Sequence, residues 1–290
     1  MKKNLLELFS GTGSVGKVAK DNYNVISLDK DMEADIKEDI MTWDYKKYPK
    51  DYFYIITASP VCLWWSRLRN CWIGRKCKTI HPTEIITKDH IMEDINKYGK
   101  PMVDKIFEII NYFNPAYWWI ENPTSGKMKN YISEKYPEYD NYYDVDYCKY
   151  SNWGYKKKTR FWTNIKDFNP KICKNDCENM VLVNNQKLHK KRLGCHKTVL
   201  DNGKIIRVNT KELIEKYRDF DNIQLQHKVV LGNGYEMING VKTVCNTKEL
   251  RNKYKNKKDK GISFNSKTTL EQRYRIPELL IKDLLEKCII

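Results

Sequence analysis

The stretch LELFSGTGSVG (residues 6–16) joins an apolar run to a glycine-rich turn and then to a helical pattern. Asn4–Phe9 predicts a buried strand, and the apolar spacing after Ser14 predicts a helix. The glycines between them let a backbone approach a nucleotide, although many strand–helix contacts use glycine for steric reasons alone. These residues therefore predict strand, turn and helix in that order.

The same order of elements recurs along the following residues. Tyr23–Asp29 predicts a second strand that ends in an acid, and Tyr52–Ala58 a third that ends at Ser59-Pro60. Met102–Phe113 has the spacing of an amphipathic helix, and Ala116–Pro123 predicts another strand. Alternation of this kind predicts an α/β fold: a Rossmann-like, mostly parallel sheet with helices on both faces. Ligands of such sheets bind at the carboxyl ends of the strands.

The composition changes from about Asp167, where Lys, Asn and turn signals become frequent. The segments 202–217 and 239–254 align without a gap, and Asn-Gly between apolar runs predicts a hairpin in each. We therefore expect a catalytic domain over 1–165 and a smaller α+β insertion over 166–265 with two hairpin–helix repeats. A helix after Pro277, within 266–290, should return to the first domain.

The net charge indicates which kind of partner the protein binds. With 53 Lys and Arg against 37 Asp and Glu, the 290-residue chain carries +16, which favours a polyanion such as nucleic acid. A Lys- and Asn-rich composition inherited from an AT-rich genome is the alternative. The sequence has neither a secretory leader nor 18 consecutive apolar residues, so we expect a soluble, cytoplasmic protein without membrane contact, and nine reduced cysteines.

Six short motifs in a fixed order carry a resemblance to a known family. They are LELFSGTG, LDKD, EDI, SPVC, IENP and YCKYSNWGYKKKTRFWTN. Together they resemble the DNA cytosine-5 methyltransferases, most closely the short phage and giant-virus type, over roughly residues 4–165 and the last 25. The resemblance implies double-stranded DNA as substrate, host cytoplasm or a viral factory as location, and residues 166–265 as the part that reads the target.

The resemblance also implies roles for particular residues. S-adenosylmethionine would be held by Phe9, Ser10, Gly11, Gly13, Asp29, Asp39, Ile40 and Pro60. Cys62 stands at the nucleophile, Glu121 at the acid that contacts the cytosine, and Arg160 in the basic substrate-contacting motif.

The chemistry explains why a sulfur and an acid are needed. Carbon 5 of cytosine is a poor nucleophile, so the family adds a thiolate to carbon 6 and obtains an enamine that attacks the methyl group. A carboxyl such as Glu121 at ring nitrogen 3 makes carbon 6 electrophilic, and the base must leave the duplex to reach both groups. A small buried thiol and a salt-bridged carboxylate are the structural alternatives for Cys62 and Glu121.

Two positions depart from the family pattern. Val61 replaces a second proline before Cys62, and Leu63 replaces the usual polar residue after it. Neither change removes a reacting group. A catalytically weak protein that binds DNA or a partner, and an RNA cytosine methyltransferase, remain the alternatives, and the sequence does not identify a protein partner.

The segment after Cys62 mixes cations with tryptophans. Arg67, Arg69, Arg75 and Lys76 alternate with Trp64, Trp65 and Trp72. Such a segment suits phosphates and an opened base stack. The alternative is a packed surface loop whose tryptophans fill the core.

A further group has the residue types of a zinc site. Cys173, Cys177 and Cys195, with His189 or His196, would supply four ligands to tetrahedral Zn²⁺ and stabilise an insertion with little core of its own. The spacing of Cys173 and Cys177 is less typical than C-x2-C, so cysteines without metal are the alternative.

Overall fold

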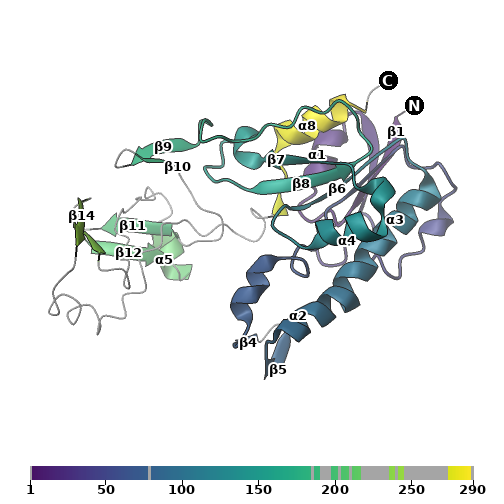
Figure 1. Ribbon diagram of the computed structural model, residues 1–290. Helices are drawn as coiled ribbons and strands as arrows, with labels where there is room; N and C mark the ends of the chain where they lie inside the picture. Colours follow the sequence, from purple (N-terminus) through teal and green to yellow (C-terminus); the bar gives the residue numbers. More distant parts are fainter. Residues whose placement is uncertain are drawn as a thin grey trace. The chain divides into compact units, whose positions relative to one another are not determined.

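The computed structural model describes residues 2–77, 80–183, 186–189, 197–201, 204–208, 211–216, 235–238, 241–244 and 274–288. The chain forms two compact units. One contains residues 1–151, 157–172 and 274–290, and the other residues 152–156 and 173–273. Residues 157–172 and the helix after Pro277 thus belong to the unit that contains the glycine turn (Figure 1).

A six-stranded sheet is the centre of the first unit, with the order β2-β1-β3-β6-β8-β7. Four strands are parallel: β1 (Lys3–Leu8), β2 (Tyr23–Leu28), β3 (Ile55–Ala58) and β6 (Tyr117–Pro123). The other two, β7 (Tyr142–Asp146) and β8 (Lys158–Thr163), pair antiparallel. The predicted α/β fold with a mostly parallel sheet is confirmed.

Both faces of this sheet are buried. Along β1, Leu6 and Leu8 belong to the large apolar core that also includes α3 (Lys100–Phe113) and part of α4 (Met128–Lys135). The alternate residues of β1, Leu5 and Glu7, are also buried, and the Glu7 carboxylate reaches the backbone of α1 (Ser14–Ala19). A strand with both faces covered is apolar nearly throughout, which explains the continuous run that the sequence shows.

Shorter elements connect the main ones in the first unit. The hairpin β4 (Lys76–Cys77) and β5 (His81–Ile85) precedes α2 (Lys88–Asp94), and a π-helical turn η3 (Ile95–Gly99) joins α2 to α3. The 3₁₀ turns are η1 (Tyr45–Lys47), η2 (Arg67–Trp72), η4 (Pro137–Tyr139) and η5 (Tyr147–Lys149).

In the described part of the second unit, three hairpins and one helix are present. The hairpins pair β9 (Met180–Val183) with β10 (Gln186–His189), β11 (Lys197–Asp201) with β12 (Lys204–Val208), and β13 (Tyr235–Ile238) with β14 (Val241–Val244). The last two surround the predicted Asn-Gly turns, and α5 (Lys211–Lys216) follows the first of these. The helix expected after Asn246 lies outside the described residues.

Helix α8 (Glu278–Glu286) belongs to the first unit and begins directly after Pro277. Its Leu280, Ile281 and Leu284 are buried. The Ile276 backbone N–H donates to the Ser14 hydroxyl at 3.1 Å, so the entry to α8 contacts the first residue of α1. Of the helices that the structure describes, none has the length and apolar character needed to cross a membrane.

Candidate active site

The glycine turn between β1 and α1 has an unusual backbone. Phe9, Gly11 and Gly13 all have positive φ angles, of 54°, 54° and 64°. A side chain at Gly11 or Gly13 would be strained by that conformation, which explains the glycines at these two positions. The Ser10 N–H donates to the Leu28 carbonyl at 3.1 Å, so the turn is fixed to the end of β2.

Asp29 follows β2 and holds the glycine turn through its carboxylate. Oδ2 accepts from the Gly11 N–H at 2.9 Å, and Oδ1 accepts from the N–H groups of Asp31 and Met32, each at 2.9 Å. The structure thus brings Asp29 together with the turn, as the sequence analysis expects. The Asp29 carboxylate also orders the backbone of the turn and of the loop after β2, which the sequence analysis did not predict.

Glu7, on β1, holds the start of α1 after the same turn through its carboxylate. The sequence analysis did not single it out. Its Oε1 accepts from the Val15 N–H at 3.0 Å and its Oε2 from the Gly16 N–H at 2.9 Å. Burial raises the pKa of Glu7 to about 7, against the opposing effect of these hydrogen bonds. A Cβ at Gly16 would lie 2.9 Å from Oε2, so a larger residue there would displace the Glu7 carboxylate.

The turn also contains a buried polar atom, the hydroxyl oxygen of Ser10. The Ser10 hydroxyl oxygen is buried and has no hydrogen-bond partner among the described residues. A buried hydroxyl without a partner is costly unless a ligand or water satisfies it. The expected cofactor residues Phe9, Ser10, Gly11, Gly13 and Asp29 therefore form one local group that fits a polar ligand.

The other expected cofactor residues lie near the ends of β2 and β3. Asp39 accepts from the Met41 N–H at 3.0 Å and pairs with Lys30 at 3.3 Å. Ile40 belongs to the apolar core, with 3% of its surface exposed. Pro60 is buried at the end of β3.

Cys62 leaves the sheet at the same edge as Glu121. Strands β3 and β6 pair in parallel with Ala58 opposite Ile120, so the residues after Ala58 and after Ile120 emerge side by side. The Asn122 side chain donates to the Pro60 carbonyl at 2.9 Å and ties the two strand ends together. Cys62 is a partly exposed, reduced thiol, as a nucleophile that must reach a substrate requires.

Glu121 is 7% exposed and has two donors at one carboxylate oxygen. The Tyr147 hydroxyl donates to Oε1 at 3.0 Å, and the Lys157 ammonium reaches the same oxygen at 3.4 Å. Neither donor was predicted from the sequence. Both lie in the motif YCKYSNWGYKKKTRFWTN, but Tyr147 is one of several tyrosines there and Lys157 one of three consecutive lysines, so the motif does not single them out.

Arg160 lies on β8 opposite Asn122, and its guanidinium pairs with Asp144 on β7. Nε and Nη2 donate to the two carboxylate oxygens at 2.6 and 2.9 Å. The guanidinium also lies 3.9 Å from the centre of the Tyr142 ring. A bidentate pair of this kind fixes the side chain, so in this structure Arg160 is held on β7 and not at the Glu121 carboxylate.

The segment after Cys62 divides between core packing and exposed cations. Trp65 is 1% exposed and stacks on Tyr131. Arg69 is equally buried and forms an ion pair with Asp94. Arg67, Arg75 and Lys76 are exposed. Trp65 and Arg69 therefore pack in the interior, as in the alternative of a packed surface loop. The exposed cations remain suited to phosphate contacts.

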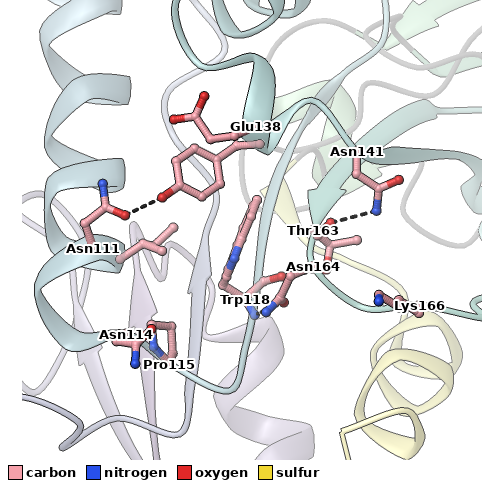
Figure 2. A pocket seen from close by; sticks show the side chains of 11 residues that line it. Asn111, Asn114, Pro115, Trp118, Glu138, Asn141, Thr163, Asn164 and Lys166 are labelled. Carbon is pink, nitrogen blue, oxygen red and sulfur yellow. Dashed lines mark hydrogen bonds between the residues drawn. The ribbon is translucent and has the colours of Figure 1, made fainter.

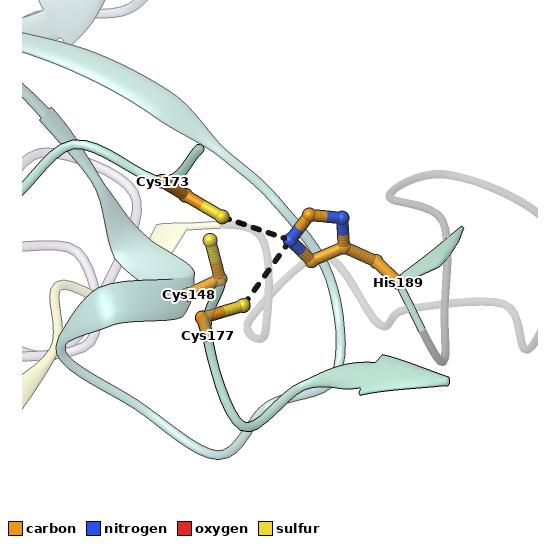
Figure 3. A group of neighbouring side chains, drawn as sticks. All are labelled: Cys148, Cys173, Cys177 and His189. Atoms are coloured by element: carbon orange, nitrogen blue, oxygen red, sulfur yellow. Dashed lines mark hydrogen bonds between the residues drawn. The ribbon is translucent and has the colours of Figure 1, made fainter. Parts of the chain in front are cut away.

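A sulfur-rich group collects near β10, as Figure 3 shows. The Nε2 atom of His189 lies 3.6 Å from the Cys173 sulfur and 3.4 Å from the Cys177 sulfur. The β9–β10 pairing places His189 opposite Met180, next to Cys177. The structure thus brings together three of the expected ligands, and Cys195 and His196 lie outside the described residues. Cys148 joins the group, whose four ligand atoms all lie within 4.8 Å of one another.

A separate pocket of about 460 Å³ lies between the end of α3 and the start of β6 (Figure 2). It is lined by asparagines and by Trp118 and Tyr139. In the parallel part of the sheet, the amino end of β6 is opposite the end that carries Glu121. The pocket is therefore not part of the Cys62–Glu121 site.

The fold and the site together define a class. A mostly parallel sheet with a glycine turn after its first strand, an acid after the second, and a thiol and a carboxyl at the next two strand ends is the arrangement that the resemblance to methyltransferases implies. No family model matches the chain. The chain is 40% identical, over 182 residues, to a probable DNA (cytosine-5)-methyltransferase of Frog virus 3 (isolate Goorha), and the match covers 61% of this chain and 78% of the relative. The chain belongs to the DNA (cytosine-5)-methyltransferase family.

Solved structures resemble the chain at low sequence identity. The methyltransferase EhMeth of Entamoeba histolytica has a TM-score of 0.47 at 12% identity, over 99% of this chain and 98% of its own. A putative DNA modification methyltransferase encoded within a prophage of E. coli has a TM-score of 0.37 at 13% identity, over 68% of this chain and 58% of its own. The family assignment rests on the frog virus relative.

Proposed function

We propose that this protein transfers a methyl group from S-adenosylmethionine to carbon 5 of cytosine in double-stranded DNA, with Cys62 as the nucleophile. The observation that carries the proposal is the emergence of Cys62 and Glu121 from adjacent parallel strands, tied by the hydrogen bond from Asn122 to Pro60. Family membership and the net charge of +16 support DNA as the substrate.

The glycine turn is the part of the chain that fits the cofactor. The Ser10 hydroxyl and the turn backbone would contact its polar groups, and Phe9 would lie against its adenine. When bound, the cofactor supplies an activated methyl group. The protein's task is to hold that group beside the carbon that attacks it, and Asp29 and Glu7 contribute by fixing the turn.

The chain's own residues carry the remaining steps of the proposed reaction. The Cys62 thiolate adds to carbon 6 of the flipped cytosine, while Glu121 hydrogen-bonds to ring nitrogen 3 and stabilises the charge that develops on the ring. Carbon 5 then takes the methyl group. A water molecule takes the proton from carbon 5, and the double bond between carbons 5 and 6 forms again as the bond between carbon 6 and the Cys62 sulfur breaks, which releases the thiolate.

Expression in bacteria tests this function directly. Bisulfite sequencing of a plasmid from expressing cells should show cytosines protected in a defined sequence context. RNA from the same cells should show no added 5-methylcytosine. Methylated RNA with unmodified plasmid would favour the RNA alternative, and an unmodified plasmid together with intact cofactor binding would favour a DNA-binding protein without activity.

Asp29 provides a test of cofactor binding. Isothermal titration should show S-adenosylhomocysteine binding at micromolar concentration or tighter, and Asp29→Ala should weaken it by about 10- to 100-fold, because hydrogen bonds to a charged group contribute roughly 1.5–3 kcal/mol. Asp31→Ala, in the same loop but exposed, should bind as the wild type does. Wild-type protein that produces no binding heat would contradict the proposed cofactor site.

We assign target reading to the second unit. In the first unit the strands and helices form the sheet and the Cys62–Glu121 site, whereas the described part of the second unit consists of short hairpins and one helix. A lysine-rich region built of short hairpins is suited to groove and phosphate contacts. The second unit contains most of the expected recognition region, residues 166–265, of which 166–172 belong to the first unit.

We also propose that the sulfur-rich group binds Zn²⁺ through Cys173, Cys177 and His189. Bonds of about 2.3 Å to sulfur and 2.0–2.1 Å to nitrogen in a tetrahedron place a sulfur and a nitrogen about 3.5 Å apart. The two sulfur–nitrogen distances of 3.6 and 3.4 Å agree with this value. Cys148 and Cys195 are the two candidates for the fourth ligand.

Elemental analysis tests the zinc proposal. Protein purified without chelators should contain about one zinc per chain, and the double variant Cys173→Ser/Cys177→Ser should contain none. Cys71→Ser removes an exposed thiol outside the group and should leave the zinc content unchanged. Single serine variants at Cys148 and Cys195 then identify the fourth ligand. A folded, metal-free wild type would show that these cysteines pack without metal.

A further inference from the structure

We infer that Tyr147 and Lys157 are positioning residues for Glu121, and that they direct the proton of its carboxyl group to Oε2. The inference rests on the proposed function, because it concerns the acid that contacts the cytosine. Neither residue was assigned a role by the sequence motifs.

The contacts at Glu121 are unequal between its two oxygens. Within the described part of the chain, the two donors recorded at this carboxyl group, the Tyr147 hydroxyl at 3.0 Å and the Lys157 ammonium at 3.4 Å, both meet Oε1. An oxygen that accepts two donors is held as the carbonyl-like oxygen of the group. A proton on the carboxyl is therefore carried by Oε2, which remains to face the base.

Both donors are fixed by their own surroundings. Tyr147 is fully buried, and its backbone N–H donates to the Lys157 carbonyl at 3.0 Å. The Lys157 ammonium lies 4.8 Å from the centre of the Tyr147 ring, within range of a cation–π contact. The two side chains thus form one rigid unit, and a rigid donor pair fixes the carboxyl plane better than two mobile ones would.

The position of Arg160 strengthens the assignment. Its guanidinium is already engaged with Asp144 in a bidentate pair and stacks on Tyr142. Lys157 is the cation that the structure places at Glu121. An ammonium is a compact charge with rotatable donors, so Lys157 can share Oε1 with a tyrosine hydroxyl more easily than a planar guanidinium can.

Single-turnover methylation tests this inference, using plasmid DNA with saturating cofactor and detection of 5-methylcytosine by mass spectrometry. Tyr147→Phe and Lys157→Met should each slow the rate by about 10- to 100-fold, the loss expected from a charged hydrogen bond of roughly 1.5–3 kcal/mol. The DNA concentration for half saturation and the affinity for S-adenosylhomocysteine should stay within about threefold of wild type. Lys157→Arg keeps the charge but replaces the compact ammonium by a planar group, so it should recover only part of the rate lost in Lys157→Met.

A double-mutant cycle distinguishes positioning from a general structural role. In a Glu121→Gln background, Tyr147→Phe should change the remaining rate by less than about threefold, because the oxygen it orients no longer belongs to an acid. Tyr143→Phe, on β7, and Lys50→Met, at an exposed position outside the site, serve as controls and should keep the wild-type rate. Circular dichroism shows which variants fold. If Tyr147→Phe does not fold, the rates of the Lys157 variants test the positioning role.

The outcomes separate this inference from the proposed function. If the wild type methylates DNA and Tyr147→Phe and Lys157→Met retain its rate, the inference is wrong and the function stands. The inference would also be wrong if the rate losses of Tyr147→Phe and Glu121→Gln multiplied fully in the double variant. A wild type that binds cofactor but methylates no DNA would overturn the proposed function, and this inference with it.

Discussion

Cys62→Ala abolishes methyl transfer while cofactor affinity stays close to wild type. The expected loss is on the order of 10⁴-fold or more, because removing a covalent nucleophile eliminates the pathway and does not merely weaken it. Cofactor binding survives because Cys62 emerges beyond β3, whereas the glycine turn and Asp29 lie at β1 and β2. Radiolabelled methyl transfer to DNA measures the first effect, and isothermal titration measures the second.

A covalent trap adds a readout that depends on the sulfur itself. DNA prepared with 5-fluorocytosine in place of cytosine should form an adduct that survives denaturing electrophoresis, because fluorine at carbon 5 blocks the elimination that frees the enzyme. Peptide mapping should place the adduct on Cys62. Cys71→Ala, which removes an exposed thiol in the same segment, should leave trapping intact. A trapped Cys71 or Cys77 would mean that the active site is assigned incorrectly.

Glu121→Gln reduces the rate of methyl transfer by about 10²- to 10⁴-fold, the usual contribution of a positioned general acid or base. Glutamine keeps the shape of the side chain and can accept from Tyr147, but it cannot carry the proton that nitrogen 3 of the base requires. The affinity for cofactor should be unchanged, and trapping by 5-fluorocytosine should slow in parallel with methylation. Rapid-quench measurement of a single turnover checks the rates of methylation and of trapping, and isothermal titration checks the cofactor affinity.

Glu138→Gln is the matched control for this prediction. Glu138 lines the pocket at the amino end of β6, at the opposite edge of the sheet from Glu121. Removing its charge changes the protein's net charge by the same amount and leaves the site untouched. Equal effects at the two positions would attribute the loss at Glu121 to net charge or stability and would contradict its role as the acid.

The parallel part of the fold could be predicted because its elements are strongly periodic. The strands at β1, β2, β3 and β6 read as apolar runs, and the glycine turn and Pro277 marked the ends of elements. The antiparallel strands β7 and β8 were not predicted as strands. Charged residues interrupt both, Asp144 and Asp146 in β7 and Lys158 and Arg160 in β8, and the sequence analysis treated the residues of β8 as part of a motif. Their placement depends on pairing with β6, a long-range contact that local pattern does not encode.

The candidate site could be predicted to a similar extent. Cys62 lies two residues after Pro60, beyond a buried strand, and Glu121 lies two residues before Pro123, near the end of another, which are local signals. Glu7 was hidden within an apolar run, where a lone acid gives no sign of the two backbone donors it meets. The partner of Arg160 was equally hidden, because Asp144 lies on another strand and the pairing exists only once β7 and β8 are side by side.

The contact between Ile276 and Ser14 has a consequence for the order of assembly during synthesis. The buried face of α8 completes the unit that contains β1 and α1, yet the whole second unit separates them along the chain. The ribosome therefore releases the glycine turn long before the segment that packs against its helix. Contacts so distant in sequence form late and slow the folding of a domain. The newly made sheet must remain partly uncovered until α8 emerges, so this is the interval in which a chaperone has most reason to hold the chain.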